Sequence, residues 1–128
     1  MTRAVRFAAV GLAGAALQLA LFRTLCYCGV AAAPATALAV ELVILNNFYW
    51  HQRITWKDRG APHLRNRARR LLRFHAANGL VSLAGNTALV AILTQTISPL
   101  PAAAAAIALC APLNYLLADR CVFLNPIN

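Results

Sequence analysis

Two clusters in the sequence combine an amide, an arginine and an aromatic ring, which is chemistry suited to a phosphate group. The first cluster consists of Asn47, Arg53 and Trp56. The second consists of Asn114, Arg120 and Phe123, each sixty-seven residues after its counterpart. A guanidinium can hold a phosphate through two parallel N–H bonds. A single arginine of this kind is more often an ordinary charge anchor near a membrane surface. Repetition at a fixed offset makes phosphate binding an equal alternative.

An acidic residue lies inside an apolar stretch. Glu41 is near the middle of the run from Ala31 to Trp50, where a charged acid costs about 2.5 to 3.5 kcal/mol on membrane-insertion scales. The apolar residues of this run return about 2 to 4 kcal/mol, so neighbouring helices or a wet cavity must shelter Glu41. Such acids often mark an ion or substrate path. The alternative is a neutral acid, hydrogen-bonded to Gln18, Asn86 or Asn114.

A stripe of polar residues follows in the second half of the chain. Steps of three, four and four residues place its members on one face of a helix, and they are His75, Asn78, Ser82 and Asn86. Gln18 lies near the place of Asn86 in the first copy if one residue slips between copies. The stripe and Gln18 could line a polar pathway, or they could form an interhelical clasp that contributes about 1 kcal/mol or less per bond.

The composition indicates that this chain lies in a lipid bilayer. Hydrophobic residues make up 61% and charged residues 12% of the 128 positions, and the mean hydropathy is +0.63. A bilayer core needs about 20 mostly apolar residues per helix. Four stretches approach this length, Phe7 to Cys28, Ala31 to Trp50, Phe74 to Ile97 and Leu100 to Ala118. We therefore expect an all-α integral membrane protein with four transmembrane helices.

The positive charges are distributed unevenly between the two sides of the membrane. Of the twelve lysine and arginine residues, eight lie between Arg53 and Arg73, and Arg3, Arg6 and Arg120 flank the same side. Arg23 is the exception. The positive-inside rule therefore predicts that both termini and the middle loop lie in the cytoplasm. We expect a multi-pass protein of the cytoplasmic (inner) membrane. The net charge of +9 could suggest nucleic-acid binding, but the distribution of the charges argues against it.

The chain repeats itself, which predicts its organisation. Arg6-Phe7 and Pro34 recur as Arg73-Phe74 and Pro101, together with the two clusters above. We predict one membrane domain, residues 1–128, built from repeat 1 (about 6–56), a basic cytoplasmic linker (57–72) and repeat 2 (about 73–123). Each repeat has two spans, so the hairpins must be parallel copies rather than inverted ones. The linker could be a loop or a surface helix that binds anionic lipids or a protein partner.

The sequence contains no pattern for covalent chemistry. We expect no enzyme activity, no catalytic residue, no metal and no cofactor, because no nucleophile and base or metal-ligand spacing is present. His51 and His63 have no partner pattern, and we expect both to be solvated. Glycine and alanine crowd the spans and let helices approach closely. These faces allow a homodimer whose protomers enclose a groove between them.

Four segments together resemble the GtrA-like family. They are Arg6-Phe7 with the glycine-bearing span after it, NNFYWHQRITW (Asn46 to Trp56), RFHAANG (Arg73 to Gly79) and NYLLADRCVF (Asn114 to Phe123). The resemblance covers nearly the whole chain. It implies a role in cell-envelope polysaccharide synthesis, as a flippase that moves a polyprenyl-phosphate-linked sugar across the membrane. Arg53 and Arg120 would then collect the phosphate, and Glu41, Asn47, Asn86 and Asn114 would bind sugar hydroxyls.

Two other functions stay open. One is a membrane scaffold that recruits a glycosyltransferase through the basic linker. The other is a proton-coupled exporter of small molecules that resembles the small multidrug resistance transporters, which also have four short spans and a buried glutamate. In those transporters the acid belongs to the first span, whereas Glu41 lies in the second.

Overall fold

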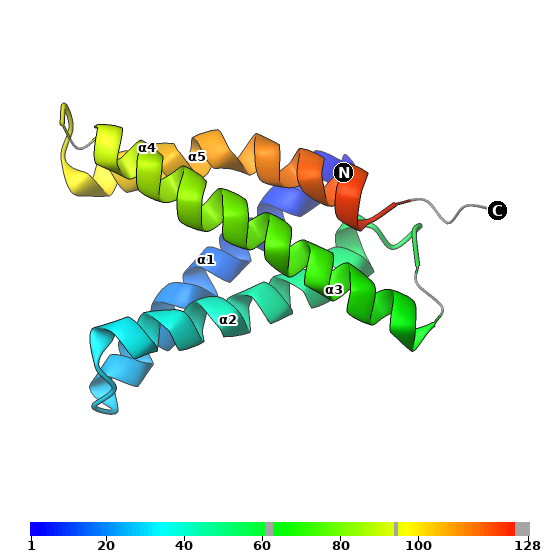
Figure 1. Cartoon of the computed structure of the whole chain (residues 1–128), viewed down its shortest axis with the longest axis horizontal. Helices are drawn as coiled ribbons and strands as arrows, with labels where there is room; N and C mark the ends of the chain where they lie inside the picture. Colours follow the sequence, from blue (N-terminus) through cyan, green and yellow to red (C-terminus); the bar gives the residue numbers. More distant parts are fainter. Residues whose placement is uncertain (61–62, 94, 125–128) are drawn as a thin grey trace. The chain divides into compact units, whose positions relative to one another are not determined.

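The computed structural model describes the chain except residues 61–62, 94 and 125–128. It also leaves out the side chains of some helical residues. All elements among the described residues are helical: α1 (Arg3–Tyr27), α2 (Ala32–Trp50), η1 (His51–Thr55), α3 (Leu64–Asn78), η2 (Gly79–Gly85), α4 (Asn86–Leu93), α5 (Pro99–Leu117) and η3 (Ala118–Val122). The three η elements are π-helical. Figure 1 shows how these elements follow one another.

The chain divides into two compact units. Unit 1 comprises Met1–Gly60 and unit 2 comprises Ala61–Asn128. In unit 1, α1 packs along α2, and η1 returns to the start of α1 (Figure 1). In unit 2, α4 and η2 pack along α5, and η3 packs on α3. Each unit is therefore an antiparallel helical hairpin whose chain begins and ends at the same end.

Local chemistry explains where the chain reverses. Gly29 has a positive φ of 86°, a conformation that glycine adopts without steric penalty. The Val30 N–H donates to the Leu25 carbonyl and the Gly29 N–H donates to the Cys26 carbonyl, both at 3.0 Å. This Schellman pattern ends α1. In unit 2, α5 begins at Pro99 after the N-cap Ser98, because proline has no N–H to lose in the first helical turn.

The buried positions of the two units differ by the same sixty-seven residues. On α2 they are Ala35, Ala39 and Val43, and on α5 they are Ala102, Ala106 and Cys110. Spacing by four places each set on one face of its helix. The alanines are fully buried, so each hairpin packs through small side chains, as is common in membrane helices.

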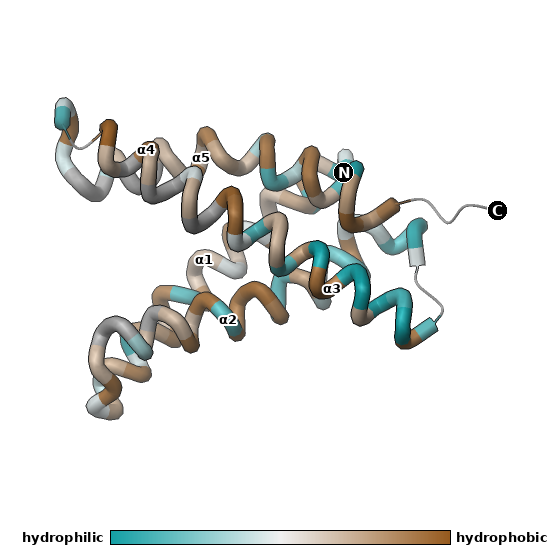
Figure 2. Tube along the Cα trace, in the orientation of Figure 1, coloured by the Kyte–Doolittle hydropathy of each residue, from teal (hydrophilic) through white to brown (hydrophobic). Residues whose placement is uncertain are grey.

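The basic segment is the first part of a long helical rod. α3, η2 and α4 follow one another without a break from Leu64 to Leu93, and at 1.5 Å per residue they span about 45 Å. The hydrocarbon core is about 30 Å thick, so the rod is longer than one crossing needs. Figure 2 shows that its first turns are hydrophilic and its later turns apolar. The linker predicted over 57–72 is thus helical from Leu64 and continuous with the third apolar stretch.

Two helical stretches are long and apolar enough to cross a membrane within the described part of the chain. They are Arg3–Tyr27 and Ala105–Val122. Only 11% and 22% of their most apolar windows are buried within the protein. A core helix of a soluble protein would be mostly buried, so these exposed apolar surfaces fit a lipid environment.

Candidate functional site

Each unit ends in a π-helical turn that leads to a buried aromatic residue. The Trp56 N–H donates to the His51 carbonyl, and the Phe123 N–H donates to the Ala118 carbonyl, both at 2.8 Å. These are i→i+5 bonds, which widen the helix and change the direction of the following side chains. Trp56 and Phe123 are both fully buried. The aromatic members of the two repeated clusters are therefore packing residues.

In unit 1 the buried aromatic joins a cluster with α1. Phe7 stacks on His51 with ring centroids 4.6 Å apart and meets Trp56 edge-on at 5.9 Å. His51 and Trp56 also meet edge-on, at 5.5 Å. His51 Nδ1 lies 3.0 Å from the Thr55 hydroxyl. This cluster closes the end of unit 1 where the chain enters and leaves.

His51 is a packing residue, and the expectation that it is solvated is wrong. It is 2% exposed, and burial lowers its pKa from the usual 6.5 to about 3. The physical cause is desolvation, which disfavours the charged imidazolium. His51 follows the apolar stretch of α2, and at neutral pH it is an uncharged ring in an aromatic cluster. His63, in contrast, is exposed as expected.

Unit 2 closes in the same way with fewer rings. Phe74 and Phe123 meet edge-on with centroids 6.1 Å apart, and the Arg70 guanidinium lies 5.7 Å from the Phe123 centroid. The position that corresponds to His51 is the buried Ala118. The closure of unit 2 therefore contains no titratable ring at this position.

An arginine on the first helix of each unit bonds to the chain that follows the buried aromatic residue. Arg3 Nη2 donates to Asp58 Oδ2 at 2.7 Å, and Arg70 Nη2 donates to the Leu124 carbonyl at 3.3 Å. An exposed ion pair contributes only about 0.2–1 kcal/mol, so these bonds mainly orient the chain after the buried aromatic. The sequence reasoning missed both residues, although Arg3 and Arg70 also lie sixty-seven positions apart.

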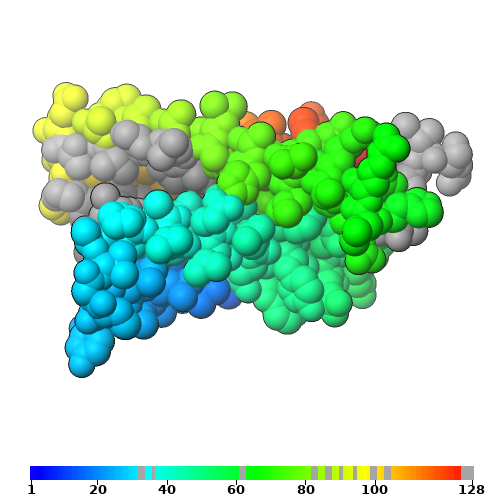
Figure 3. All heavy atoms as spheres, turned by 60° about the horizontal axis from the view of Figure 1, so that its bottom comes forward, coloured from blue at the N-terminus to red at the C-terminus, as the bar shows by residue number. Residues whose placement is uncertain are grey.

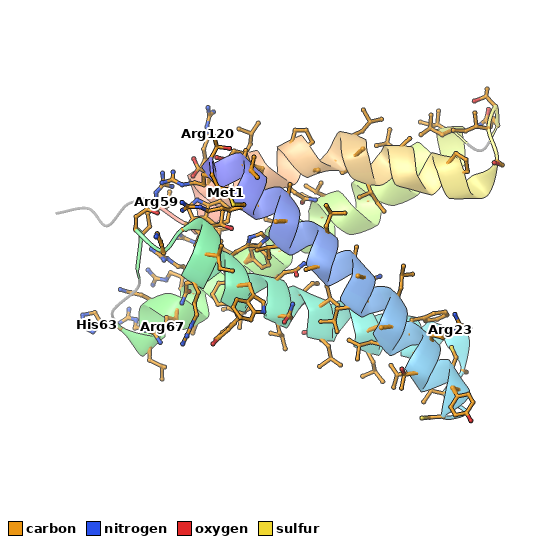
Figure 4. The ribbon with its side chains drawn as sticks, turned by 180° about the vertical axis from the view of Figure 1, so that it is seen from behind. Met1, Arg23, Arg59, His63, Arg67 and Arg120 are labelled. Atoms are coloured by element: carbon orange, nitrogen blue, oxygen red, sulfur yellow. The ribbon has the colours of Figure 1, made fainter. Side chains whose placement is uncertain are left out.

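The repeated arginines occupy the same place in the two π-helical turns. Arg53 is the third residue of η1 and Arg120 is the third residue of η3, and both side chains are exposed. The Arg53 guanidinium lies 4.6 Å from the centre of the Tyr49 ring. Figure 4 shows Arg120 extending away from its helix. Each unit thus presents an outward guanidinium at the same place in its π-helical turn.

Asn47 and Asn114, the amide residues of the two repeated clusters, are less exposed than the arginines. The Asn47 side chain lies against α1 at Gly14, where an added Cβ would sit 2.8 Å from Asn47 Cγ. Asn47 Oδ1 is buried and has no hydrogen-bond partner among the described residues. Asn114 is half-buried on α5, and Val81 stands at the position that corresponds to Gly14. Asn47 therefore has a packing role that Asn114 does not copy.

A family comparison now gives these observations a context. The model of the family described as GtrA/DPMS, transmembrane domain, matches residues 6–123. The chain belongs to this family. Its resemblance to GtrA-like proteins is thereby confirmed, and with the apolar helices it identifies a membrane protein. Membership of the GtrA/DPMS family ties the chain to membrane-linked glycosylation of polysaccharides. A comparison with curated proteins found no match.

The other polar candidates of this GtrA/DPMS chain lie on separate helices. In unit 1, Gln18 is half-buried on α1 and Glu41 lies on the exposed part of α2. In unit 2, His75 and Asn78 are half-buried on α3. The side chains of the remaining two candidates, Ser82 in η2 and Asn86 in α4, lie outside the described residues. The polar pathway therefore stays a prediction.

Unit 2 also carries an apolar groove of about 450 Å³ between its two long helices. The lining combines small and aliphatic residues: Leu80, Val81, Ala84, Gly85, Ala88, Leu89, Leu109, Cys110, Leu113 and Leu117. A Cβ added at Gly85 would lie 3.2 Å from Cys110 Sγ. In a GtrA/DPMS protein such a surface fits hydrocarbon, because its lining carries no charged side chain.

We predict that Gly14→Ala destabilises unit 1 although alanine is the better helix former. A Cβ would overlap the buried Asn47 amide, and overpacking of this kind costs about 1–3 kcal/mol. The matched control is Gly11→Ala, where nothing lies within 4 Å of the added atom. Thermal unfolding in detergent measures both. In the double variant Gly14→Ala with Asn47→Ala the overlap is gone, so additive losses would contradict this account.

We predict that His51 makes the protein sensitive to acid. Its pKa in the folded state is about 3, below the value of about 6.5 in the unfolded chain. Between these values the unfolded chain binds a proton that the fold excludes. Stability is therefore full above about pH 6.5 and falls with decreasing pH, by at most about 1.4 kcal/mol per pH unit.

The experiment is thermal unfolding across this pH range, with tryptophan fluorescence as the signal in a Trp50→Phe background, where the buried Trp56 is the remaining tryptophan. His51→Ala, which installs the residue found at position 118, should be less stable at neutral pH but should lose less stability in acid. His63→Ala should keep the slope of the natural chain, because His63 is exposed. An unchanged slope in His51→Ala would contradict the assignment.

Proposed function

We propose that this chain is a flippase that moves a polyprenyl-phosphate-linked sugar across the cytoplasmic membrane for glycosylation of cell-surface polysaccharide. The observation that carries the proposal is the pair of exposed arginines, Arg53 and Arg120, at the same position of two π-helical ends. Membership of the GtrA/DPMS family supports the pathway. The flippase needs no covalent step, since the lipid-linked sugar only changes leaflet.

The proposed topology has four membrane-crossing helices in two parallel hairpins. Its support is that α2 and η1 recur as α5 and η3 with bounds shifted by sixty-seven residues. Within unit 1, Figure 4 shows Met1 and Arg59 at one end and Arg23 at the other. Within unit 2, the basic start of α3 lies at the closed end with η3. The positive-inside rule then places the closed ends, both termini and the start of α3 in the cytoplasm.

The substrate's two parts have different requirements. Its prenyl tail can stay in hydrocarbon, whereas its phosphate and sugar need polar partners on the way across. In this proposal Arg53 and Arg120 bind the phosphate, and Glu41, Asn86 and Asn114 offer hydrogen bonds to sugar hydroxyls. Asn47 can do so only by leaving its place against Gly14. A homodimer would provide a larger groove than one pair of hairpins.

Arg53→Gln and Arg120→Gln test the proposal. A hydrogen bond to a charged group contributes about 1.5–3 kcal/mol, so loss of either guanidinium should slow movement of the substrate by roughly tenfold or more. The measurement is transbilayer movement of polyprenyl-phosphate hexose in proteoliposomes. Arg65→Gln is the matched control, an exposed arginine outside the π-helical turns. Unchanged rates in both variants would refute the phosphate role.

A scaffold that recruits a glycosyltransferase is the second candidate function. It is favoured by the start of α3, where Leu64 is 83% and Leu72 is 72% exposed beside exposed arginines. Figure 3 shows these first turns at the surface of the molecule. A protein partner with an acidic and apolar face would complement this surface.

The two functions are separated by charge reversal on α3. If the scaffold function holds, Arg65→Glu with Arg69→Glu should abolish co-purification of a co-expressed glycosyltransferase and leave lipid movement in proteoliposomes intact. Arg53→Gln should give the opposite pattern and serves as the control. Retained co-purification in the α3 variant would exclude recruitment through this helix.

A further inference from the structure

Unit 1 presents two exposed aromatic rings next to its repeated arginine. Tyr49 is 46% and Trp50 is 43% exposed, and their ring centroids lie 5.2 Å apart in an edge-on arrangement. Both residues end α2, directly before η1. Together with Arg53 they form a surface that we call the aromatic platform (Tyr49, Trp50 and Arg53).

Unit 2 has no such platform, although its backbone is the same here. The corresponding residues are Leu116 and Leu117, which end α5 directly before η3. Leu116 is 45% exposed, close to the value for Tyr49. Leu117 is half-buried and lines the groove of unit 2. The two units therefore carry different chemistry at equal positions beside the same outward arginine, aromatic in one and aliphatic in the other.

The platform rings are not needed to close unit 1. That closure is made by Phe7, His51 and the fully buried Trp56. Tyr49 and Trp50 keep more than two fifths of their surface exposed, so a large apolar and polarisable area remains available for contact. Rings of this kind give large contact area with few rotatable bonds and are common in binding surfaces.

The contact of Arg53 with Tyr49 is compatible with phosphate binding. The guanidinium carbon lies 4.6 Å from the centre of the ring, within the range of a cation–π contact. A guanidinium in such a contact keeps N–H groups in its own plane, which suit a bidentate bond to a phosphate. The ring also limits the rotamers of Arg53, so less freedom is lost when an anion binds.

We propose that Tyr49 and Trp50 bind the sugar ring of a phosphate-linked glycolipid while Arg53 holds its phosphate. This inference rests on the proposed function and adds to it the residues that recognise the sugar. The C–H face of a pyranose is weakly positive and packs on the negative face of an aromatic ring. The phosphate is joined to the anomeric carbon, so sugar and phosphate are neighbours, as are the rings and the guanidinium. Unit 1 then selects for the sugar, and unit 2 holds phosphate without such selection.

The test uses the residues of unit 2 as the substitution. In the double variant Tyr49→Leu with Trp50→Leu, the full chain in nanodiscs is titrated with polyprenyl-phosphate glucose, galactose and mannose, and with polyprenyl phosphate alone. We expect affinity for the glycosylated lipids to fall about tenfold, with affinity for polyprenyl phosphate unchanged. Tyr49→Phe with Trp50→Phe should retain the preference for sugar, because the ring faces remain.

The controls distinguish recognition from anchoring. Tyr27→Leu removes an exposed tyrosine at the other end of α1 and should change neither affinity. Arg53→Gln should weaken binding of both lipid classes. If the double leucine variant keeps the preference for glycosylated lipid, or loses both classes equally, the rings are interfacial anchors and the inference is overturned while the proposed function stands. If the natural chain binds neither class, the proposed function fails and this inference fails with it.

Discussion

The contact between the first helix and a buried aromatic residue beyond the second helix is the interaction on which each unit depends. Trp56 meets Phe7 in unit 1, and Phe123 meets Phe74 in unit 2. In lipid there is little hydrophobic drive to hold two apolar helices together, so packing of this kind has to supply the association. The small residues of α2 and α5 allow the close approach, and the aromatic contacts fix the ends.

The π-helical turns follow from the same constraint. In an ordinary α-helix the side chains of Trp56 and Phe123 would point in another direction. The i→i+5 turn adds a residue and directs both side chains toward the first helix of their unit. Other residues of the two turns, such as Thr55 and Val122, are buried as well, whereas Arg53 and Arg120 on the opposite side are exposed. Closure of the hairpin and presentation of the arginine are therefore two results of one backbone feature.

The two units share this architecture but differ in their side chains. Unit 1 has the titratable His51 and the exposed rings Tyr49 and Trp50, and unit 2 has Ala118, Leu116 and Leu117 in their places. Unit 2 has an apolar groove, and its basic helix α3 continues through η2 and α4 as a rod longer than one membrane crossing. The common parts serve closure and charge placement, and the differences give each unit its own surface for ligands or partners.

The sequence alone determined the helical class, the membrane environment and the family, because these depend on composition, apolar lengths and motifs that need no tertiary information. It also located Arg53 and Arg120.

The roles of the neighbouring residues were decided by the tertiary structure alone. His51 and His63 look alike in sequence, but one is buried in a ring cluster because the hairpin brings Phe7 to it. The bonds of Arg3 and Arg70 depend on the same closure. A basic amphipathic stretch has the same periodicity whether it lies on a membrane surface or extends a membrane-crossing helix. The sequence therefore could not predict that α3 begins at Leu64 and continues into the third apolar stretch. The sequence predicts Asn47 as a ligand. Its place against Gly14 arises from the close approach of two helices, which no local pattern encodes.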